Sequence, residues 1–203
     1  MKTKSYAHSK RALDIIFSAV LLMFLWLLML IVGLLIRITS QGPAIFKQKR
    51  VGRDGRIFTC YKFRTMYSYA PSDRPTSSFP DAERYITPIG RFLRRSSLDE
   101  LPQLWNVLIG DMSLVGPRPL IPREITVHEL RKQSGAYSLR PGITGLAQIS
   151  GRDLLDDEEK ASFDAIYASS ASPVFDLKII AKTLGKIFSD KDISGKKDRA
   201  GQT

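Results

Sequence analysis

Residues 15–36, IIFSAVLLMFLWLLMLIVGLLI, contain no charged side chain. At about 1.5 Å per residue, a helix of these 22 residues is about 33 Å long, which is enough to cross the core of a bilayer. A cleaved signal peptide is the alternative, because four basic residues precede the segment. However, the apolar part of a signal peptide has only about 7–15 residues, and no small-x-small cleavage pattern follows here. We therefore expect a retained membrane helix.

Basic residues on both sides of this segment bear on its orientation. Residues 1–11 carry four basic groups and no acid, and further basic residues follow the segment: Arg37, Lys47, Lys49, Arg50 and Arg53. The positive-inside rule places both flanks in the cytoplasm, which a straight spanning helix cannot satisfy but a re-entrant helix can. The segment offers only Ser18 and Gly33 as weak break points and has no proline. From the residues alone, re-entrant and spanning helices both remain open.

The whole chain is strongly basic. Its 203 residues carry a net charge of +11, which favours anionic partners such as nucleic acid, anionic lipid or phosphorylated substrates. Cys60 is the only cysteine, so an internal disulfide is excluded and a reducing compartment is favoured. Its place in a strand-like run predicts a buried structural thiol.

The pattern predicts an α+β fold that is mainly helical. Residues 44–66 read as a β-hairpin with an Asp-Gly turn, and residues 67–88 read as a loop with four prolines. Short amphipathic helices are expected on the surface of a compact catalytic domain, at about 89–95, 100–109, 122–133, 156–168 and 175–188. We expect three parts: a basic start and membrane helix (1–40), this domain (41–188), and a polar, disordered tail (189–203).

Asp99 and Glu100 stand next to an arginine cluster in this basic chain. Ser97-x-x-Glu100 matches a capping box, in which Glu100 would only satisfy a backbone N–H. Pro102 opposes that register, because it would fall where a helical N–H is needed. With Asp99 as the N-cap, Pro102 takes a position whose N–H is unpaired anyway. Asp99 would then lie at a helix mouth that can also receive a phosphate, so capping and catalysis both remain open.

Two further loops present arginine beside proline. GPRP (116–119) restricts Arg118 to few directions, as bidentate phosphate or carboxylate recognition requires, although a structural ion pair is the alternative. RPGITGLAQ (140–148) adds Arg140, Gln148 and two glycines, which alone is a weak phosphate-loop signal. The histidines are isolated, so no zinc site is readable. Carboxylates beside phosphate-seeking groups suit Mg²⁺.

Taken together, several motifs in a fixed order carry a resemblance over about residues 9–188. They are YKFRTM (61–66), Arg94 through SLDELPQ (97–103), GDMS (110–113), GPRP (116–119), RPGITGLAQ (140–148) and GR (151–152). They resemble the bacterial sugar transferase family, the small monotopic phosphoglycosyl transferases. Members commonly carry a Ser-Pro pair in the middle of the membrane helix. This chain has Trp26-Leu27 there. The resemblance and the basic flanks still favour a re-entrant helix, whose bend must then form without proline.

The resemblance implies a two-step reaction. Asp99 would attack the β-phosphate of a UDP-sugar and release UMP, and a polyprenyl phosphate would then take the phosphosugar from the aspartate. Mg²⁺ would bridge Asp99 and the diphosphate, and Glu100 would assist the second step. Arg94 would hold a phosphate. The other implied substrate-binding residues are Lys62, Arg64, Arg118, Arg140, Gln148 and Arg152.

The resemblance also implies where the chain acts and with what. The expected partners are a UDP-sugar, polyprenyl phosphate and anionic membrane lipid at the cytoplasmic face of the bacterial inner membrane, with a homo-oligomer possible and no nucleic acid. Two alternatives stay open: a glycosyltransferase that releases UDP, and a membrane-tethered protein that binds nucleic acid or anionic lipid. No recognition module for nucleic acid is visible in the sequence.

Overall fold

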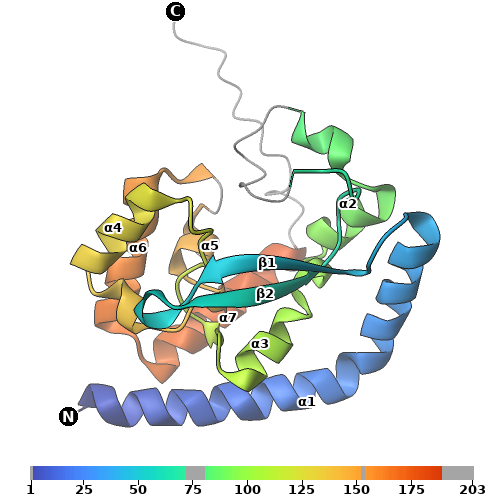
Figure 1. Ribbon diagram of the computed structural model, residues 1–203. Coiled ribbons are helices and arrows are strands. Elements are labelled where there is room, and N and C mark those ends of the chain that lie inside the picture. Colours follow the sequence, from blue (N-terminus) through green and yellow to red (C-terminus); the bar gives the residue numbers. More distant parts are fainter. Residues whose placement is uncertain (1, 72–80, 152–153, 189–203) are drawn as a thin grey trace, which may run out of the picture.

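The computed structural model describes residues 2–71, 81–151 and 154–188. It is an α+β fold dominated by helices, as the sequence predicts (Figure 1). An antiparallel sheet pairs β1 (Ile45–Val51) with β2 (Ile57–Phe63), and a parallel sheet pairs β3 (Ser113–Val115) with β4 (Gly142–Thr144). The helices are α1 (Lys2–Thr39), α2 (Pro88–Arg95), α3 (Gln103–Ile109), α4 (Ile125–Gln133), α5 (Leu146–Ser150), α6 (Asp157–Ser170) and α7 (Pro173–Phe188). Single 3₁₀ turns are η1 (Arg53–Gly55), η3 (Ala82–Tyr85), η4 (Leu98–Glu100) and η5 (Ala136–Ser138).

By length and composition, α1 is able to cross a membrane over Tyr6–Thr39. Only 11% of its most apolar window is buried inside the protein, so most of these side chains face outward. The helix is continuous through Ser18, Gly33 and the Trp26-Leu27 pair. The helix axis is nevertheless bent: its first part runs along one side of the domain, and its second part rises toward the start of β1 (Figure 1). The Ser18 hydroxyl donates to the Ile15 carbonyl (3.1 Å), a bond that bends helices slightly.

The N-terminal part of α1 is tied to α7. Tyr6 Oη and Lys10 Nζ both donate to Oδ2 of Asp176, at 2.7 and 2.5 Å. Tyr167 Oη of α6 donates to the other oxygen of the same carboxylate at 2.7 Å. One acid on α7 therefore joins three elements.

Two more side chains of α1 bind the domain, one at the end of α3 and the other at β3. The Arg11 guanidinium donates to two carbonyls in the last turn of α3, Val107 (2.6 Å) and Leu108 (2.9 Å). This satisfies acceptors that a helix end leaves unpaired and places a cation at its negative pole. Asp14 is only 4% exposed and accepts from Ser113 Oγ (2.8 Å) and the Leu114 N–H (3.1 Å). A buried carboxylate thus fixes α1 to β3.

The C-terminal end of α1 packs on the same domain. Val32 and Ile36 share a buried cluster with Phe63 of β2 and Leu93 of α2. The buried Arg64 guanidinium binds the two residues that follow the helix. It donates to the Ser40 carbonyl (2.8 Å), the Ser40 hydroxyl (2.8 Å) and the Gln41 carbonyl. Both ends of the apolar helix are therefore anchored to one domain.

The predicted hairpin is confirmed. Its strands run in register from Ile45 opposite Phe63 to Val51 opposite Ile57. Asp54 (φ 56°) and Gly55 (φ 77°) take left-handed conformations in the turn, which is the backbone that the Asp-Gly signal favours. Cys60 is buried on β2, as predicted.

The prediction that Asp99 is the N-cap of a helix from about 100 to 109 is wrong. Instead, Ser97 adopts a left-handed conformation (φ 56°) and η4 forms a tight turn that contains Asp99. The following helix α3 begins only at Gln103, with Pro102 as its N-cap. The missing N–H of Pro102 therefore costs no helical hydrogen bond, and Ser97 makes no side-chain capping bond.

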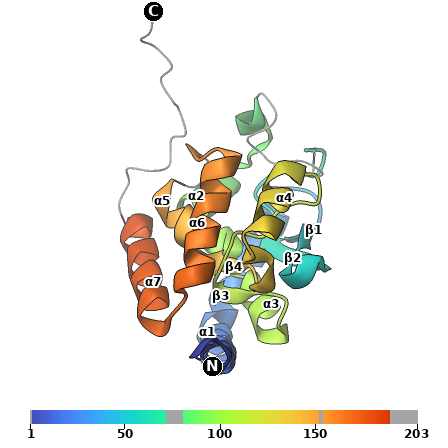
Figure 2. The same ribbon diagram turned by 90° about the vertical axis from the view of Figure 1, so that its left-hand side faces the viewer.

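Helices α7, α6 and α4 form a row, seen from left to right in Figure 2. The predicted helices at 122–133, 156–168 and 175–188 all form, with ends shifted by a few residues. Asp156 and Glu159 make the capping box of α6, where acids crowd the first turn. Part of the predicted loop 67–88 forms η3 and the start of α2. The predicted tail, 189–203, lies outside the described residues.

Candidate active site

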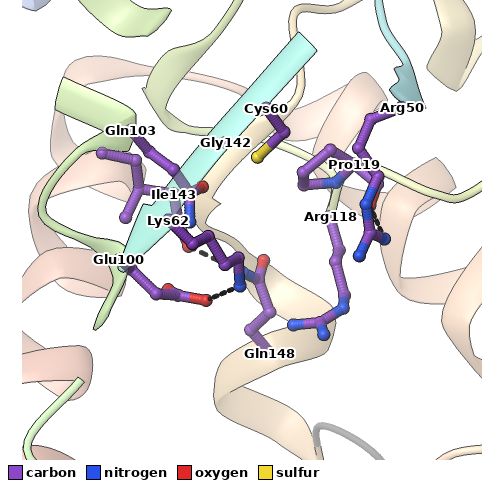
Figure 3. A pocket seen from close by; sticks show the side chains of 10 residues that line it. All are labelled: Arg50, Cys60, Lys62, Glu100, Gln103, Arg118, Pro119, Gly142, Ile143 and Gln148. Carbon is purple, nitrogen blue, oxygen red and sulfur yellow. Dashed lines mark hydrogen bonds and ion pairs between the residues drawn. The ribbon is translucent and has the colours of Figure 1, made fainter. Parts of the chain in front are cut away.

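A polar pocket opens between the hairpin, η4, the GPRP loop, β4 and α5 (Figure 3). Three basic side chains and one acid converge on it: Arg50 from β1, Lys62 from β2, Arg118 from the GPRP loop, and Glu100 from η4. The remaining lining residues are Cys60, Gln103, Pro119, Gly142, Ile143 and Gln148. The excess of positive charge suits an anionic ligand.

Lys62 and Glu100 form an ion pair across this pocket, with 2.6 Å between Nζ and Oε1. Their side chains are 22% and 18% exposed, so solvent screens the pair only partly. Glu100 is thus engaged with a lysine from the hairpin.

Asp99 lies beside the pocket. Among the described residues that line it, Glu100 is present and Asp99 is not. The pKa of the Asp99 carboxyl is raised to about 6, chiefly by burial and next by the charge of Glu100, while Lys62 and Arg94 act in the opposite direction. At neutral pH the group is still mostly ionised, yet it is more basic than an ordinary aspartate.

Two other arginines donate hydrogen bonds to backbone carbonyls of the GPRP loop that carries Arg118. Arg131 Nη1 donates to the Arg118 carbonyl (2.9 Å) and Arg50 Nη1 to the Pro119 carbonyl (2.8 Å). Arg131 is itself fixed by a buried ion pair, donating from Nε (2.8 Å) and Nη2 (2.5 Å) to Asp164 of α6. The prediction of a restrained Arg118 is therefore supported by contacts from Arg131 and Arg50, which lie outside the GPRP loop.

Two amides of the pocket have buried polar atoms without a hydrogen-bond partner among the described residues. These atoms are Nε2 of Gln103 and Oε1 of Gln148. Gln148 uses its other amide atom to donate to the Ile143 carbonyl at 2.7 Å. Because buried polar groups in folded proteins are nearly always paired, an unused donor and an unused acceptor in one pocket indicate a ligand site.

Comparison with known proteins decides the family. The family model for bacterial sugar transferases matches residues 5–190, nearly the whole chain. The chain belongs to the bacterial sugar transferase family. The motifs in the sequence and the basic lining of the pocket agree with this assignment.

Several curated relatives of this sugar transferase are clearly similar. It is 40% identical over 184 residues to the uncharacterized sugar transferase EpsL of Bacillus subtilis, covering 91% of this chain and 89% of that protein. It is 39% identical over 193 residues to UDP-glucose:undecaprenyl-phosphate glucose-1-phosphate transferase of Escherichia coli, and 40% identical over 197 residues to undecaprenyl-phosphate galactose phosphotransferase of Salmonella typhimurium. The matches cover 90% and 89% of this chain but only 40% of each of those two longer proteins.

The structure separates the predicted substrate-binding residues of the sugar transferase into two groups. Lys62, Arg118 and Gln148 line the pocket. Arg94 lies close enough to affect the charge of Asp99, and its Nε donates to Thr65 Oγ1 at 2.9 Å. Three of these residues therefore share the pocket with Glu100, and Lys62 and Arg94 act on the charge of Asp99.

Of the other three predicted substrate contacts, the two that the structure describes, Arg64 and Arg140, do not line the pocket. Arg64 is buried against the end of α1, where its guanidinium donates to Ser40 and Gln41, and it is not among the described residues that line the pocket. Arg140 is not among the described residues lining the pocket, and its Nε donates to the Gly110 carbonyl at 2.9 Å. Arg152 lies outside the described residues.

Arg50 is a pocket residue that the sequence did not reveal as one. Burial, and then the charge of Arg118, lower the pKa of Arg50 to about 10, so it stays protonated at neutral pH. The available signal was the strand alternation, which puts Arg50 and Gln48 on one face of β1. Arg50 does bond to the Gln48 side chain.

The donor set at this site fits Mg²⁺. The described residues contain no group of three or more His, Cys, Asp or Glu that would hold a metal by protein ligands alone. Asp99 and Glu100 instead supply two adjacent carboxylates, and the charge of Glu100 adds to the burial that raises the pKa of Asp99, so a nearby cation would be favourable. Mg²⁺ often binds through one or two carboxylates, with substrate phosphates completing its shell.

Proposed function

We propose that this sugar transferase moves a sugar-1-phosphate from a UDP-sugar to polyprenyl phosphate and releases UMP. The observation that carries the proposal is the charge arrangement of the pocket. One acid pair, Asp99 and Glu100, meets Lys62 and Arg118 on separate elements, beside a long apolar helix. The longer relatives named as undecaprenyl-phosphate glucose or galactose transferases support the donor and acceptor classes.

The chemistry balances as two displacements at one phosphorus. An oxygen of Asp99 attacks the β-phosphorus of the UDP-sugar, a P–O bond forms to the carboxylate, and the bond to the α-phosphate breaks to release UMP. A phosphate oxygen of the acceptor then attacks the same phosphorus and expels the Asp99 carboxylate. The product is polyprenyl-diphosphate-sugar, and Asp99 is regenerated.

The pocket residues have separate tasks in this scheme. Arg118 and Arg50 bind and orient diphosphate oxygens, as guanidinium groups do in bidentate contacts. Lys62 holds Glu100 and limits the build-up of negative charge beside Asp99. Asp99 and Glu100 are the residues that would hold Mg²⁺, which when bound would reduce the repulsion between the nucleophile and the diphosphate.

The decisive experiment identifies the nucleotide and the adduct. The purified chain is incubated with radiolabelled UDP-glucose or UDP-galactose, Mg²⁺ and undecaprenyl phosphate, and the nucleotide product is separated. UMP is expected, whereas UDP would identify a transferase that moves the sugar alone. Without acceptor, intact-mass spectrometry is expected to show a hexose-phosphate on Asp99. No adduct in the wild type, or an adduct retained in Asp99→Asn, would contradict the assignment.

We also propose that α1 is re-entrant, with the catalytic domain on the cytoplasmic face. The support is that Arg11 and Asp14 bind the domain near one end of the apolar segment, while Val32, Ile36 and Ser40 contact it near the other. The two ends of a spanning helix lie on opposite faces of the bilayer, so they cannot both contact one domain on a single face.

This topology is tested by cysteine labelling in spheroplasts. Ala7→Cys and Arg56→Cys place exposed thiols before and after the apolar segment, and the native Cys60 is buried. A re-entrant helix protects both thiols from a membrane-impermeant maleimide until the cells are permeabilised. Labelling of position 7 alone in intact spheroplasts would demonstrate a spanning helix.

A further inference from the structure

A second cavity of about 280 Å³ lies next to the polar pocket, and its lining is mainly apolar. Glu100, Ile143 and Gln148 line both spaces, so the two adjoin at Glu100. The other lining residues are Leu21, Leu25, Arg95, Ser97, Leu101, Leu104, Thr144, Ile149, Thr183 and Lys186.

One wall of this groove comes from the apolar segment of α1. Leu21 and Leu25 lie one helical turn apart and face the groove. Leu104 of α3 and Ile149 of α5 line it from the domain. The groove thus runs between the apolar helix α1 and Glu100 of the acid pair.

Two cationic residues border the same groove. Arg95 is the last residue of α2, and Lys186 lies near the end of α7. A hydrogen bond of 2.7 Å between the Thr144 and Thr183 hydroxyls joins β4 to α7 within the lining. A groove with apolar walls and cationic residues is complementary to a ligand that has an apolar chain and an anionic end.

We propose that this groove receives the phosphate-bearing end of the polyprenyl acceptor, with Leu21, Leu25, Leu104 and Ile149 contacting its first isoprene units and Lys186 attracting its phosphate. This assignment rests on the proposed function. The cavity is near the lower limit of small-molecule pockets, which hold about 300–1,000 Å³. It accommodates only the head of a long lipid, so the remaining chain stays in the bilayer along α1.

The first test fills the groove from the α1 side. Leu25→Trp is expected to raise the KM for undecaprenyl phosphate by about tenfold, the scale by which an apolar pocket discriminates. UMP release in a single turnover without acceptor should be unchanged. Leu34→Trp is the matched control, because Leu34 is an exposed apolar residue of the same helix outside the groove lining. Equal acceptor KM in the two variants would overturn the proposal.

The second test uses charge. Lys186→Ala is expected to raise the KM for the acceptor severalfold, whereas Lys178→Ala, two turns earlier on α7 and fully outside the lining, should leave it unchanged. No difference between these variants would remove Lys186 from the assignment. If the wild type itself fails to transfer to undecaprenyl phosphate, the proposed function fails rather than the groove.

A third measurement does not depend on the variants being active. A photoreactive polyprenyl phosphate, with its diazirine on the first isoprene unit, is cross-linked to the wild-type chain in nanodiscs. Cross-links are expected on groove residues and should be lost on adding excess undecaprenyl phosphate. Cross-links confined to other parts of α1, or competition by phospholipid instead, would show that an ordinary bilayer lipid occupies the groove.

Discussion

Lys62 of β2 and Glu100 of η4 are joined by a 2.6 Å ion pair although they are 38 positions apart in the sequence. The pair controls the charge of the neighbouring Asp99. Lys62 lowers the pKa of Asp99 and Glu100 raises it, while burial is the largest cause of the net increase to about 6.

The rate of UMP release should therefore depend on the ionisation of Asp99. Below pH 6 the carboxyl becomes protonated and cannot attack phosphorus, so kcat/KM is expected to fall with an apparent pKa near 6. Removing the positive charge in Lys62→Met should raise the pKa of Asp99 and move this acid limb of the pH profile to higher pH. Removing the negative charge in Glu100→Gln lowers the pKa and moves the limb to lower pH.

The measurement is the pH profile of single-turnover UMP release for each variant. Lys49→Met is the control, since Lys49 is an exposed lysine of the same hairpin and does not line the pocket. Shifts in the same direction for Lys62→Met and Glu100→Gln would refute the opposing effects of these two groups.

Asp99→Asn should remove activity and increase stability. Loss of the nucleophile is expected to lower UMP release by about 10³-fold or more. Because the pKa of Asp99 is raised on folding from 3.8 to about 6, its ionised form destabilises the folded state above that range. The Asn variant should thus melt at a higher temperature at pH 7.5, with the gain fading as pH falls below about 4, where the acid is neutral in both states.

Thermal unfolding in detergent at the two pH values checks this prediction. For a chain of this size, each kcal/mol corresponds to roughly 2–4 °C. A variant that is inactive and also less stable at pH 7.5 would indicate that Asp99 has a structural role.

Breaking the Arg131–Asp164 pair should affect both stability and substrate binding. Arg131→Met leaves the carboxylate of Asp164, which is 1% exposed, without its partner, and such losses cost about 3–5 kcal/mol. The Arg118 carbonyl also loses its donor, so the KM for the UDP-sugar should increase. Lys160→Met is the control, because it breaks the exposed pair with Asp157 and should cost less than about 1 kcal/mol. Denaturant unfolding and donor titration measure the two effects.

Arg64 and Arg118 should differ in what their loss does. Arg118→Met is expected to raise the KM for the UDP-sugar at least tenfold with little change in stability, because Arg118 lines the pocket. Arg64→Met is expected to lower the melting temperature while leaving the KM for the UDP-sugar nearly unchanged, because Arg64 binds Ser40 and Gln41. The opposite pattern would restore Arg64 to the substrate site.

Local signals in the sequence were sufficient for the elements. The uncharged stretch of 22 residues predicted α1, and the Asp54-Gly55 turn predicted the hairpin, because both depend on side chains that are close in sequence. The boundary at Asp99 failed for a local reason: Ser97 takes a left-handed conformation that few non-glycine residues adopt, and it starts a separate 3₁₀ turn.

By itself, then, the sequence determined the apolar helix, the hairpin, the acid pair Asp99-Glu100 and the motifs that mark a sugar transferase. Only the tertiary structure decided which cation each group faces: Glu100 pairs with Lys62, Arg131 with Asp164, and Arg64 with the end of α1. Arginine and lysine side chains are long, and many carboxylates and carbonyls compete for them. Their partners therefore depend on how distant elements pack, which is also why the groove between α1 and Glu100 has no signature in the sequence.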